Sequence, residues 1–228
     1  MPTTPAVLVF DVNETLLDIG SLAPLFERLF GDRRILREWF AQLVMYSMTV
    51  TLTEGYVDFS ALARGALRLL GEAYRVDVTD DDLDRLRTGL LTMPAHSDAG
   101  EGLAALRDGG FRLATLTNSP PNPDGPTALE NSGLAHFFEQ RLSVDARHAF
   151  KPAPAVYRYA CETLGVSPGQ CMMVAAHPWD LLGAQNVGFG AALVTRPGNP
   201  PLPVDGLPQP DLVVADLRRL AQRLAGPH

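Results

Sequence analysis

Four short, mostly aliphatic runs are the clearest signal in the pattern along the chain. They cover residues 7–10, 113–116, 172–175 and 191–194. Strands of a parallel sheet covered on both faces are hydrophobic throughout, whereas half-exposed strands alternate with polar residues. The runs therefore predict four buried parallel strands, and residues 212–214 predict a short strand at the sheet edge.

Segments with helical periodicity separate the later strands. Hydrophobic residues three apart, followed by a pair of glycines, predict a helix over residues 100–109. Similar patterns predict helices over residues 153–164, 180–186 and 217–224. Because strands and helices alternate, we expect an α/β fold with a doubly wound parallel sheet.

The interval between the first two strands breaks this alternation. It predicts helices and no strand, over residues 22–30, 35–48, 59–74 and 80–91. Thr49, Thr51 and Thr53 are expected in a link between two of these helices, which Gly55 closes. Such an insertion predicts a helical bundle over the carboxyl edge of the sheet, where ligands bind in this fold class. We therefore expect a core domain of residues 1–19 and 96–228 and a cap domain of residues 20–95.

Composition and charge narrow the class of partner. The chain has 228 residues, 46% of them hydrophobic, and a formal net charge of −7, which is typical of a globular protein with a hydrophobic core. The acidic balance argues against nucleic acid or an anionic membrane as partner, so we expect a small molecule. No hydrophobic run approaches the roughly 20 residues that cross a bilayer. The N-terminal residues lack the basic region of a secretory signal, which predicts a cytoplasmic protein.

The two cysteines, Cys161 and Cys171, have no CxxC spacing, and we expect both to be buried without a disulfide. The five histidines are scattered, with no pair at metal-ligand spacing, so a zinc site is not expected; they are His96, His136, His148, His177 and His228.

Polar side chains gather where the predicted strands end. Asp11 and Thr15 follow the first strand, Thr117 and Asn118 follow the second, and Lys151, His177 and Asp180 flank the third. The carboxyl ends of parallel strands meet at one edge of the sheet, so these groups are expected to converge there.

A carboxylate at such an edge predicts nucleophilic catalysis. Asp11 is suited to attack an electrophilic carbon or phosphorus and form a covalent intermediate. Lys151 would keep that carboxylate ionised, because a nearby cation lowers the pKa of an aspartate. Thr117 and the following backbone N–H groups are candidates to bind substrate oxygens, and Asp180 to hold the lysine, orient water or ligate a cation.

Together these residues match the order of motifs in a known enzyme superfamily. The chain resembles the haloacid dehalogenase superfamily through four segments in the family's order, namely Phe10-Asp11-Val12-Asn13-Glu14-Thr15-Leu16, Leu116-Thr117-Asn118-Ser119, Lys151-Pro152 and Trp179-Asp180. Tyr157, six residues after the lysine, and Gly183-Ala184 are similar to the 2-haloacid dehalogenase branch in particular. The resemblance extends over nearly the whole chain, including the helical cap.

The resemblance implies an activity and residue roles. Asp11 would displace halide from C2 of a 2-haloalkanoic acid, and water would then cleave the aspartyl ester to release a 2-hydroxy acid. Thr117 and Asn118 would correspond to the carboxylate-binding pair, Lys151 to the essential lysine and Asp180 to the residue that supports it. The resemblance implies no metal or other cofactor, and it suggests a homodimer through the cap and neighbouring helices.

The chain departs from that branch around the expected pocket. Phe40 follows Trp39 where the branch has a halide-receiving arginine, and Arg37 on the same predicted helix reaches the pocket only from a displaced position. Asn13, Ala175 and His177 stand where the branch has an aromatic residue, a serine and an asparagine. We expect Trp39, Phe40, Asn13, Thr15, His177 and Tyr157 to contribute to the substrate pocket, and Glu14 to be solvated or to cap a helix.

Two other functions stay open at this point. A Mg²⁺-dependent phosphatase of the same superfamily would hold the ion with Asp11 and Asp180, which offer hard oxygen ligands. That branch uses an acid two positions after the nucleophile to protonate the leaving alcohol, and Asn13 has no proton to give. The other alternative is a catalytically silent relative that acts as a binding protein, with Asp11 and Lys151 in structural roles.

Overall fold

The computed structural model describes residues 5–226, so His228 and the outermost residues of the expected core domain, 1–4 and 227–228, lie outside the described part. The described chain contains a six-stranded parallel sheet in the order β3-β2-β1-β4-β5-β6. The strands are β1 (Val7–Phe10), β2 (Arg112–Thr117), β3 (Gln140–Ser143), β4 (Cys171–Ala175), β5 (Gly190–Val194) and β6 (Leu212–Val214).

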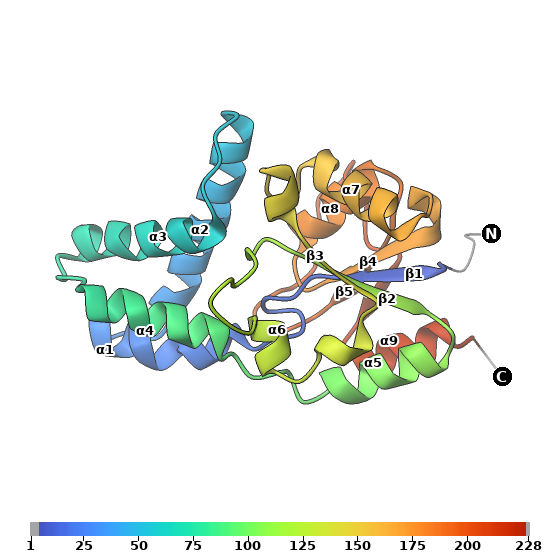
Figure 1. Ribbon diagram of the computed structural model, residues 1–228, viewed down its shortest axis with the longest axis horizontal. Helices are drawn as coiled ribbons and strands as arrows, with labels where there is room; N and C mark the ends of the chain where they lie inside the picture. Colours follow the sequence, from blue (N-terminus) through green and yellow to red (C-terminus); the bar gives the residue numbers. More distant parts are fainter. Residues whose placement is uncertain (1–4, 227–228) are drawn as a thin grey trace.

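Helices cover both faces of the sheet, as the continuous hydrophobic strands predict. Figure 1 shows α5 (Ala99–Asp108) and α9 (Leu217–Leu224) below the sheet, and α7 (Pro154–Leu164) and α8 (Pro178–Asn186) above it. Every residue of β1 and β4 is buried between these layers. The predicted doubly wound α/β fold is thus confirmed, and each predicted strand is present to within one residue of its expected ends.

Strand β3 was not predicted, and its sequence explains why. It reads Gln140-Arg141-Leu142-Ser143, and only Leu142 is buried. An edge strand with one buried position lacks the hydrophobic run that marks a central strand. Four short elements also carried too little pattern to be predicted, namely α6 (Ala128–Asn131) and the 3₁₀ helices Ala135–Phe137, Val144–Arg147 and Pro168–Gln170.

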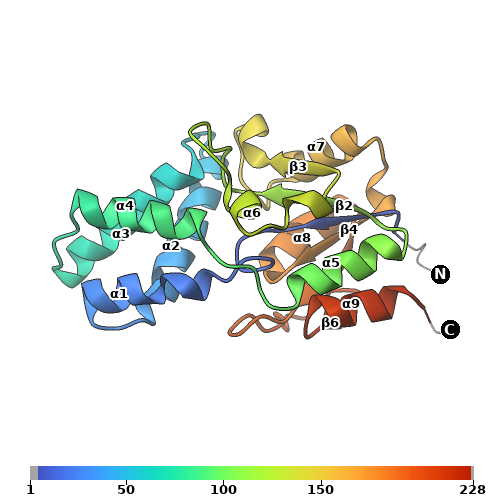
Figure 2. The same cartoon turned by 60° about the horizontal axis from the view of Figure 1, so that its bottom comes forward.

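The helices inserted after β1 group at one end of the sheet in both views (Figures 1 and 2). They are a 3₁₀ turn (Ile19–Leu22), α1 (Ala23–Phe30), α2 (Ile35–Leu52), α3 (Phe59–Tyr74) and α4 (Asp80–Leu91). Asp58 caps α3, and Thr79 caps α4 in a capping box with Asp82, so local sequence sets where both begin. Within residues 5–226, no helix is long and apolar enough to cross a membrane.

Helix α2 is one turn longer than expected, so the predicted link over Thr49 and Thr51 is wrong. Both hydroxyls donate to the carbonyl four residues earlier, at 2.8 and 2.9 Å, and so are satisfied inside the helix. The Thr51 hydroxyl also accepts the backbone N–H of Phe150 at 3.0 Å. This contact with the core, one residue before Lys151, stabilises the extra turn. No local pattern could show a contact between residues so far apart in the chain.

A buried ion pair fixes the loop that follows β1. Arg196 donates to Asp98 at 2.7 Å, and its other guanidinium nitrogens donate to the carbonyl of Thr15 at 2.9 and 3.1 Å. Asp98 also accepts the backbone N–H of Leu217 at 2.8 Å. Burial raises the pKa of Asp98, but its bonds from Arg196 and Leu217 outweigh that effect and hold the pKa below 3.8. Arg196 and Asp98 thereby connect the loop at Thr15 to the start of α9, although these segments are far apart in the chain.

We expect Asp98→Ala to lower the free energy of unfolding by about 3–5 kcal/mol, because it leaves the Arg196 charge buried without its partner. Urea denaturation followed by circular dichroism measures this loss. The matched control is Glu101→Ala, which removes an exposed pair with Arg218 (3.4 Å) and should cost no more than about 1 kcal/mol. Equal losses in the two variants would contradict the structural role assigned to Asp98.

Candidate active site

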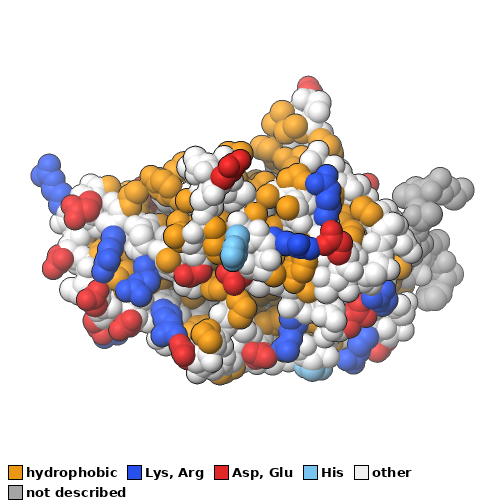
Figure 3. Space-filling view, turned by 45° about the horizontal axis from the view of Figure 1, so that its top comes forward, with side chains coloured by type: hydrophobic (Ala, Val, Ile, Leu, Met, Phe, Trp, Pro, Cys, Tyr) orange, Lys and Arg blue, Asp and Glu red, His pale blue; other side chains and the backbone are white. Residues whose placement is uncertain are grey.

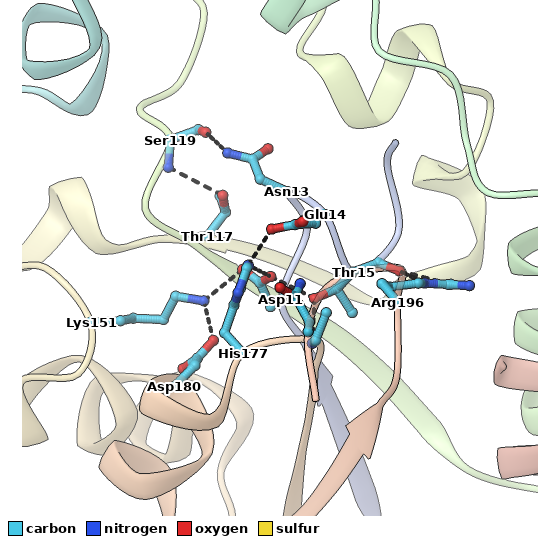
Figure 4. Close-up of polar contacts among 12 residues, drawn as sticks. Asp11, Asn13, Glu14, Thr15, Thr117, Ser119, Lys151, His177, Asp180 and Arg196 are labelled. Atoms are coloured by element: carbon cyan, nitrogen blue, oxygen red, sulfur yellow. Dashed lines mark hydrogen bonds and ion pairs between the residues drawn. The ribbon is translucent and has the colours of Figure 1, made fainter. Parts of the chain in front are cut away.

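A lysine lies between two buried carboxylates at the carboxyl edge of the sheet (Figure 4). The Lys151 Nζ atom is 2.8 Å from Asp11 Oδ1 and 2.5 Å from Asp180 Oδ2. Asp11 directly follows β1, Asp180 lies in the first turn of α8, and Lys151 lies in the loop before α7. All three are buried, and Lys151 is the only lysine in the chain. The strand order reverses beside β1, which is where ligands bind in doubly wound sheets.

Two hydroxyl groups orient the carboxylates. The Thr15 hydroxyl donates to Asp11 Oδ2 at 2.6 Å and accepts the backbone N–H of Ala176 at 2.9 Å. The Tyr157 hydroxyl donates to Asp180 Oδ1 at 2.6 Å. Each carboxylate therefore shares the lysine through one oxygen and receives a hydroxyl through the other.

Opposing electrostatic effects decide the charge states. Burial raises the pKa of Asp11, but the charges of Lys151 and His177 and the bonds from Lys151 and Thr15 outweigh it, so the pKa lies below 3.8. Burial lowers the pKa of Lys151, but the two carboxylates outweigh that effect and raise it above 10.5. Burial and the charge of Asp11 raise the pKa of Asp180. Asp11 is therefore an ionised carboxylate at neutral pH, as a nucleophile requires.

The loop after β2 lies beside this cluster. Asn118 accepts the backbone N–H of Lys151 through Oδ1 at 3.0 Å, and so positions the lysine. The Thr117 hydroxyl accepts the backbone N–H of Ser119 at 3.1 Å, and Asn13 donates to the Ser119 hydroxyl at 3.1 Å. Ser119 was not among the predicted site residues, although it directly follows two of them.

A cleft of about 800 Å³ opens at this loop. Asn13, Thr117 and Ser119 line one side, and hydrophobic residues of the inserted helices, such as Phe59 and Leu90, line the other. The cleft is within the size range of roughly 300–1,000 Å³ in which proteins bind small organic ligands.

The expectation that Glu14 is solvated or caps a helix is wrong. It is 7% exposed, and its Oε2 atom lies 3.5 Å from His177 Nε2. Its backbone has a φ of 65°, in the left-handed region, which turns the side chain back toward the site. Nothing in the local sequence shows this direction; the one signal is the position of Glu14 inside the segment that carries Asp11.

Arg37 does not point at Asp11. Its Nη2 atom donates to the carbonyl of Pro197 at 2.5 Å and to Glu14 Oε1 at 3.4 Å. Phe40, one turn of helix away, instead packs its ring against His177 at 5.5 Å between centroids. The cation of Arg37 is thus engaged at the rim of the site.

The predicted site residues separate into groups. The structure brings together Asp11, Thr15, Lys151, Tyr157, His177 and Asp180, with Asn13, Thr117 and Asn118 on adjacent loops and Phe40 over the His177 ring. Trp39 is not brought to this cluster. It is fully buried, donates from its indole to the carbonyl of Ala63 at 3.0 Å and packs against Phe26.

The two carboxylates do not fit a Mg²⁺ site. Asp11 and Asp180 meet across the Lys151 ammonium, and their other oxygens accept hydroxyl groups. A divalent cation would have to displace a buried ammonium with which both carboxylates are paired. Among the described residues, no group of three or more His, Cys, Asp or Glu side chains is placed to hold a metal ion.

Comparison with known proteins agrees with this geometry. Residues 5–188 match the profile of the haloacid dehalogenase-like hydrolases. The chain belongs to the haloacid dehalogenase-like hydrolases. It is 33% identical over 195 residues to (S)-2-haloacid dehalogenase 4A of Burkholderia cepacia, covering 85% of this chain and 84% of that protein. The family that the sequence motifs predict is therefore confirmed.

A second relative is similar to this hydrolase in both sequence and structure. This hydrolase is 33% identical to the (S)-2-haloacid dehalogenase of Xanthobacter autotrophicus, covering 83% of this chain and 74% of that protein. The solved structure of L-2-haloacid dehalogenase from Xanthobacter autotrophicus with chloropropionic acid covalently bound is similar with a TM-score of 0.86 and 28% identity. That match covers 98% of this chain and all of the other.

We expect Asp11→Asn to lower the pKa of Lys151, because the ammonium then keeps only one carboxylate partner. Because this hydrolase has one lysine, ¹⁵N-lysine labelling yields a single side-chain signal, and its NMR titration measures the pKa directly. The matched control is Asp145→Asn, which removes a carboxylate bonded to Tyr56 instead. If Asp11→Asn and the control titrate alike, the pairing of Lys151 with Asp11 is contradicted.

Proposed function

We propose that this hydrolase is a 2-haloacid dehalogenase that converts (S)-2-haloalkanoic acids into 2-hydroxy acids and halide. The observation that carries the proposal is the ionised, buried Asp11 carboxylate paired with the only lysine, on the loop whose next residues, Val12 and Asn13, line an 800 Å³ cleft. The curated relatives at about 30% identity, named as (S)-2-haloacid dehalogenases, support the same chemistry.

In the first half-reaction, Asp11 attacks C2 of the substrate and displaces the halide with inversion. A C–O bond forms as the C–halogen bond breaks, and Asp11 becomes a neutral ester. Lys151 and Thr15 hold the two oxygens of the nucleophile, so its attack geometry is set before substrate binds. The Thr117 hydroxyl and the Asn118 amide are proposed to bind the substrate carboxylate.

In the second half-reaction, water adds to the Asp11 carboxyl carbon and the ester C–O bond breaks. The Lys151 ammonium, 2.8 Å from Asp11 Oδ1, stabilises the negative charge that develops on that oxygen. Asp180 holds the ammonium in place, and Tyr157 holds Asp180. No step requires a metal or an organic cofactor.

A phosphatase is disfavoured by the residue two positions after the nucleophile. Asn13 donates its amide to Ser119 and carries no acidic proton for a leaving alcohol. The three buried charges disfavour a silent binding protein. A buried ion pair contributes little to stability, so its presence here is better explained by catalysis than by structure.

We expect wild-type enzyme to release halide from (S)-2-chloropropionate, and Asp11→Asn to lower that rate at least about 1,000-fold because the nucleophile is lost. Ion chromatography of halide measures this, with a 2-bromoacid and fluoroacetate as further substrates. Asp108→Asn, which removes an exposed carboxylate at the end of α5, is the control.

Two results would overturn the proposed function. One is phosphate release from an aryl phosphate in Mg²⁺ without halide release from any haloacid, which would identify a phosphatase. The other is inactivity in both assays, which would identify a binding protein.

We also propose that residues 20–95 form a cap on a core of residues 1–19 and 96–228, and that the enzyme is cytoplasmic and forms a homodimer through the cap. Large hydrophobic side chains are exposed on the projecting end of α2 (Figure 3), including Met45 (47%) and Leu52 (84%). Burying such a surface stabilises association.

We expect Leu52→Asp to shift the enzyme from dimer to monomer without loss of secondary structure, because it places a charge in the proposed interface. Sedimentation velocity measures the shift, and Leu202→Asp, an exposed leucine in the loop before β6, is the control. A monomeric wild type would refute the dimer and leave the proposed chemistry untouched.

A further inference from the structure

One buried nitrogen in the site has no hydrogen-bond partner. Within residues 5–226, the Nε2 atom of His177 is buried and unpaired, and the whole residue is 5% exposed. The ring is held between Phe40 and Trp179, with centroid separations of 5.5 and 5.1 Å. A buried polar atom without a partner costs about 1–3 kcal/mol, so an atom held in this way points to a role in binding or catalysis.

The unpaired nitrogen faces the nucleophile. Nε2 lies 4.0 Å from Asp11 Oδ2 and 3.5 Å from Glu14 Oε2 (Figure 4). A separation of 4.0 Å is too long for a direct hydrogen bond, but one water can bridge it. A water in that position would contact the carboxyl group that becomes the ester.

We propose that His177 is the general base of the second half-reaction, which removes a proton from the water that hydrolyses the Asp11 ester, while Glu14 positions the imidazole. The inference rests on the proposed dehalogenase function. It assigns a catalytic role to a residue that the first half-reaction does not use.

Asp180 also has basic oxygens near the ester, and both of them are engaged. Oδ2 accepts the Lys151 ammonium, and Oδ1 accepts the Tyr157 hydroxyl. Asp180 is also fully buried behind the lysine. Among the described residues, His177 offers a buried Nε2 atom that has no hydrogen-bond partner and lies 4.0 Å from Asp11 Oδ2.

The charges around His177 change during the reaction. In the free enzyme the imidazole faces the carboxylates of Asp11 and Glu14, with Lys151 beyond the first and Arg37 beyond the second. Alkylation of Asp11 removes one of these two carboxylate charges.

Protons and bonds balance through the step. As the water oxygen bonds to the Asp11 carboxyl carbon, one water proton moves to Nε2. The tetrahedral intermediate collapses, the C–O bond to the substrate breaks, and Nε2–H protonates the leaving 2-hydroxy acid. The remaining acid proton on Asp11 passes through the imidazole to solvent and restores the starting carboxylate. One proton reaches solvent per turnover, which matches the halide released.

We expect His177→Asn to release one equivalent of halide per active site at the wild-type rate and then to stall, with steady-state kcat at least about 100-fold lower. Rapid-quench halide assays measure the burst, and mass spectrometry of the Asp11 peptide should show the accumulated ester. His177→Gln is a second variant, and circular dichroism establishes folding of both. His136→Asn, at an exposed histidine, is the control.

A variant of Glu14 tests whether His177 or Glu14 is the general base. Glu14→Gln should keep the burst and lower kcat by about 10-fold, because the imidazole stays in place with a weaker partner. Ester accumulation in Glu14→Gln but not in His177→Asn would assign the base to Glu14 and overturn the proposal.

Two other results on His177 would also overturn it. Loss of the first-turnover burst in both His177 variants would place His177 in the displacement step, and a kcat within about threefold of wild type would exclude catalysis by His177. Neither affects the dehalogenase function, whereas a wild-type enzyme that releases no halide overturns that function and this inference together.

Discussion

The site depends on one ammonium group shared by two buried carboxylates. Removing three charges from water is costly, and their mutual attraction offsets that cost only when every remaining oxygen has a partner. Thr15 and Tyr157 supply those partners, and Asn118 fixes the backbone of Lys151. This requirement explains why so many segments converge on a single side chain.

The sheet makes that convergence possible. Strands β1 and β4 are neighbours, so Asp11 and the start of α8 emerge side by side, although more than 160 residues separate them in the chain. The Arg196–Asp98 pair holds the Thr15 carbonyl from behind and restricts the loop that carries the nucleophile. Rigid support of this kind keeps a reactive carboxylate aimed at its target.

The contacts between α2 and the site are arranged around His177. Phe40 packs against its ring, Glu14 faces its free nitrogen, and Arg37 bonds to Glu14 and to the loop at Pro197. The aromatic residue of α2 therefore acts by orienting an imidazole, while the arginine one turn away joins α2 to the core. These contacts connect the expected cap to the chemistry at Asp11 through packing and charge.

The sequence by itself determined the hydrophobic strands, most of the helices, the family and the convergence of Asp11, Lys151 and Asp180, because these follow from periodicity and from motifs at strand ends. Only the tertiary structure decided the edge strand β3, the last turn of α2, the burial of Glu14 and the placement of Trp39 in the helical core. Each of these depends on contacts between residues far apart in the chain, such as Thr51 with Phe150 and Glu14 with His177. A local pattern reports which face of an element is hydrophobic, but the direction of a polar side chain is set by the partner that the fold brings to it.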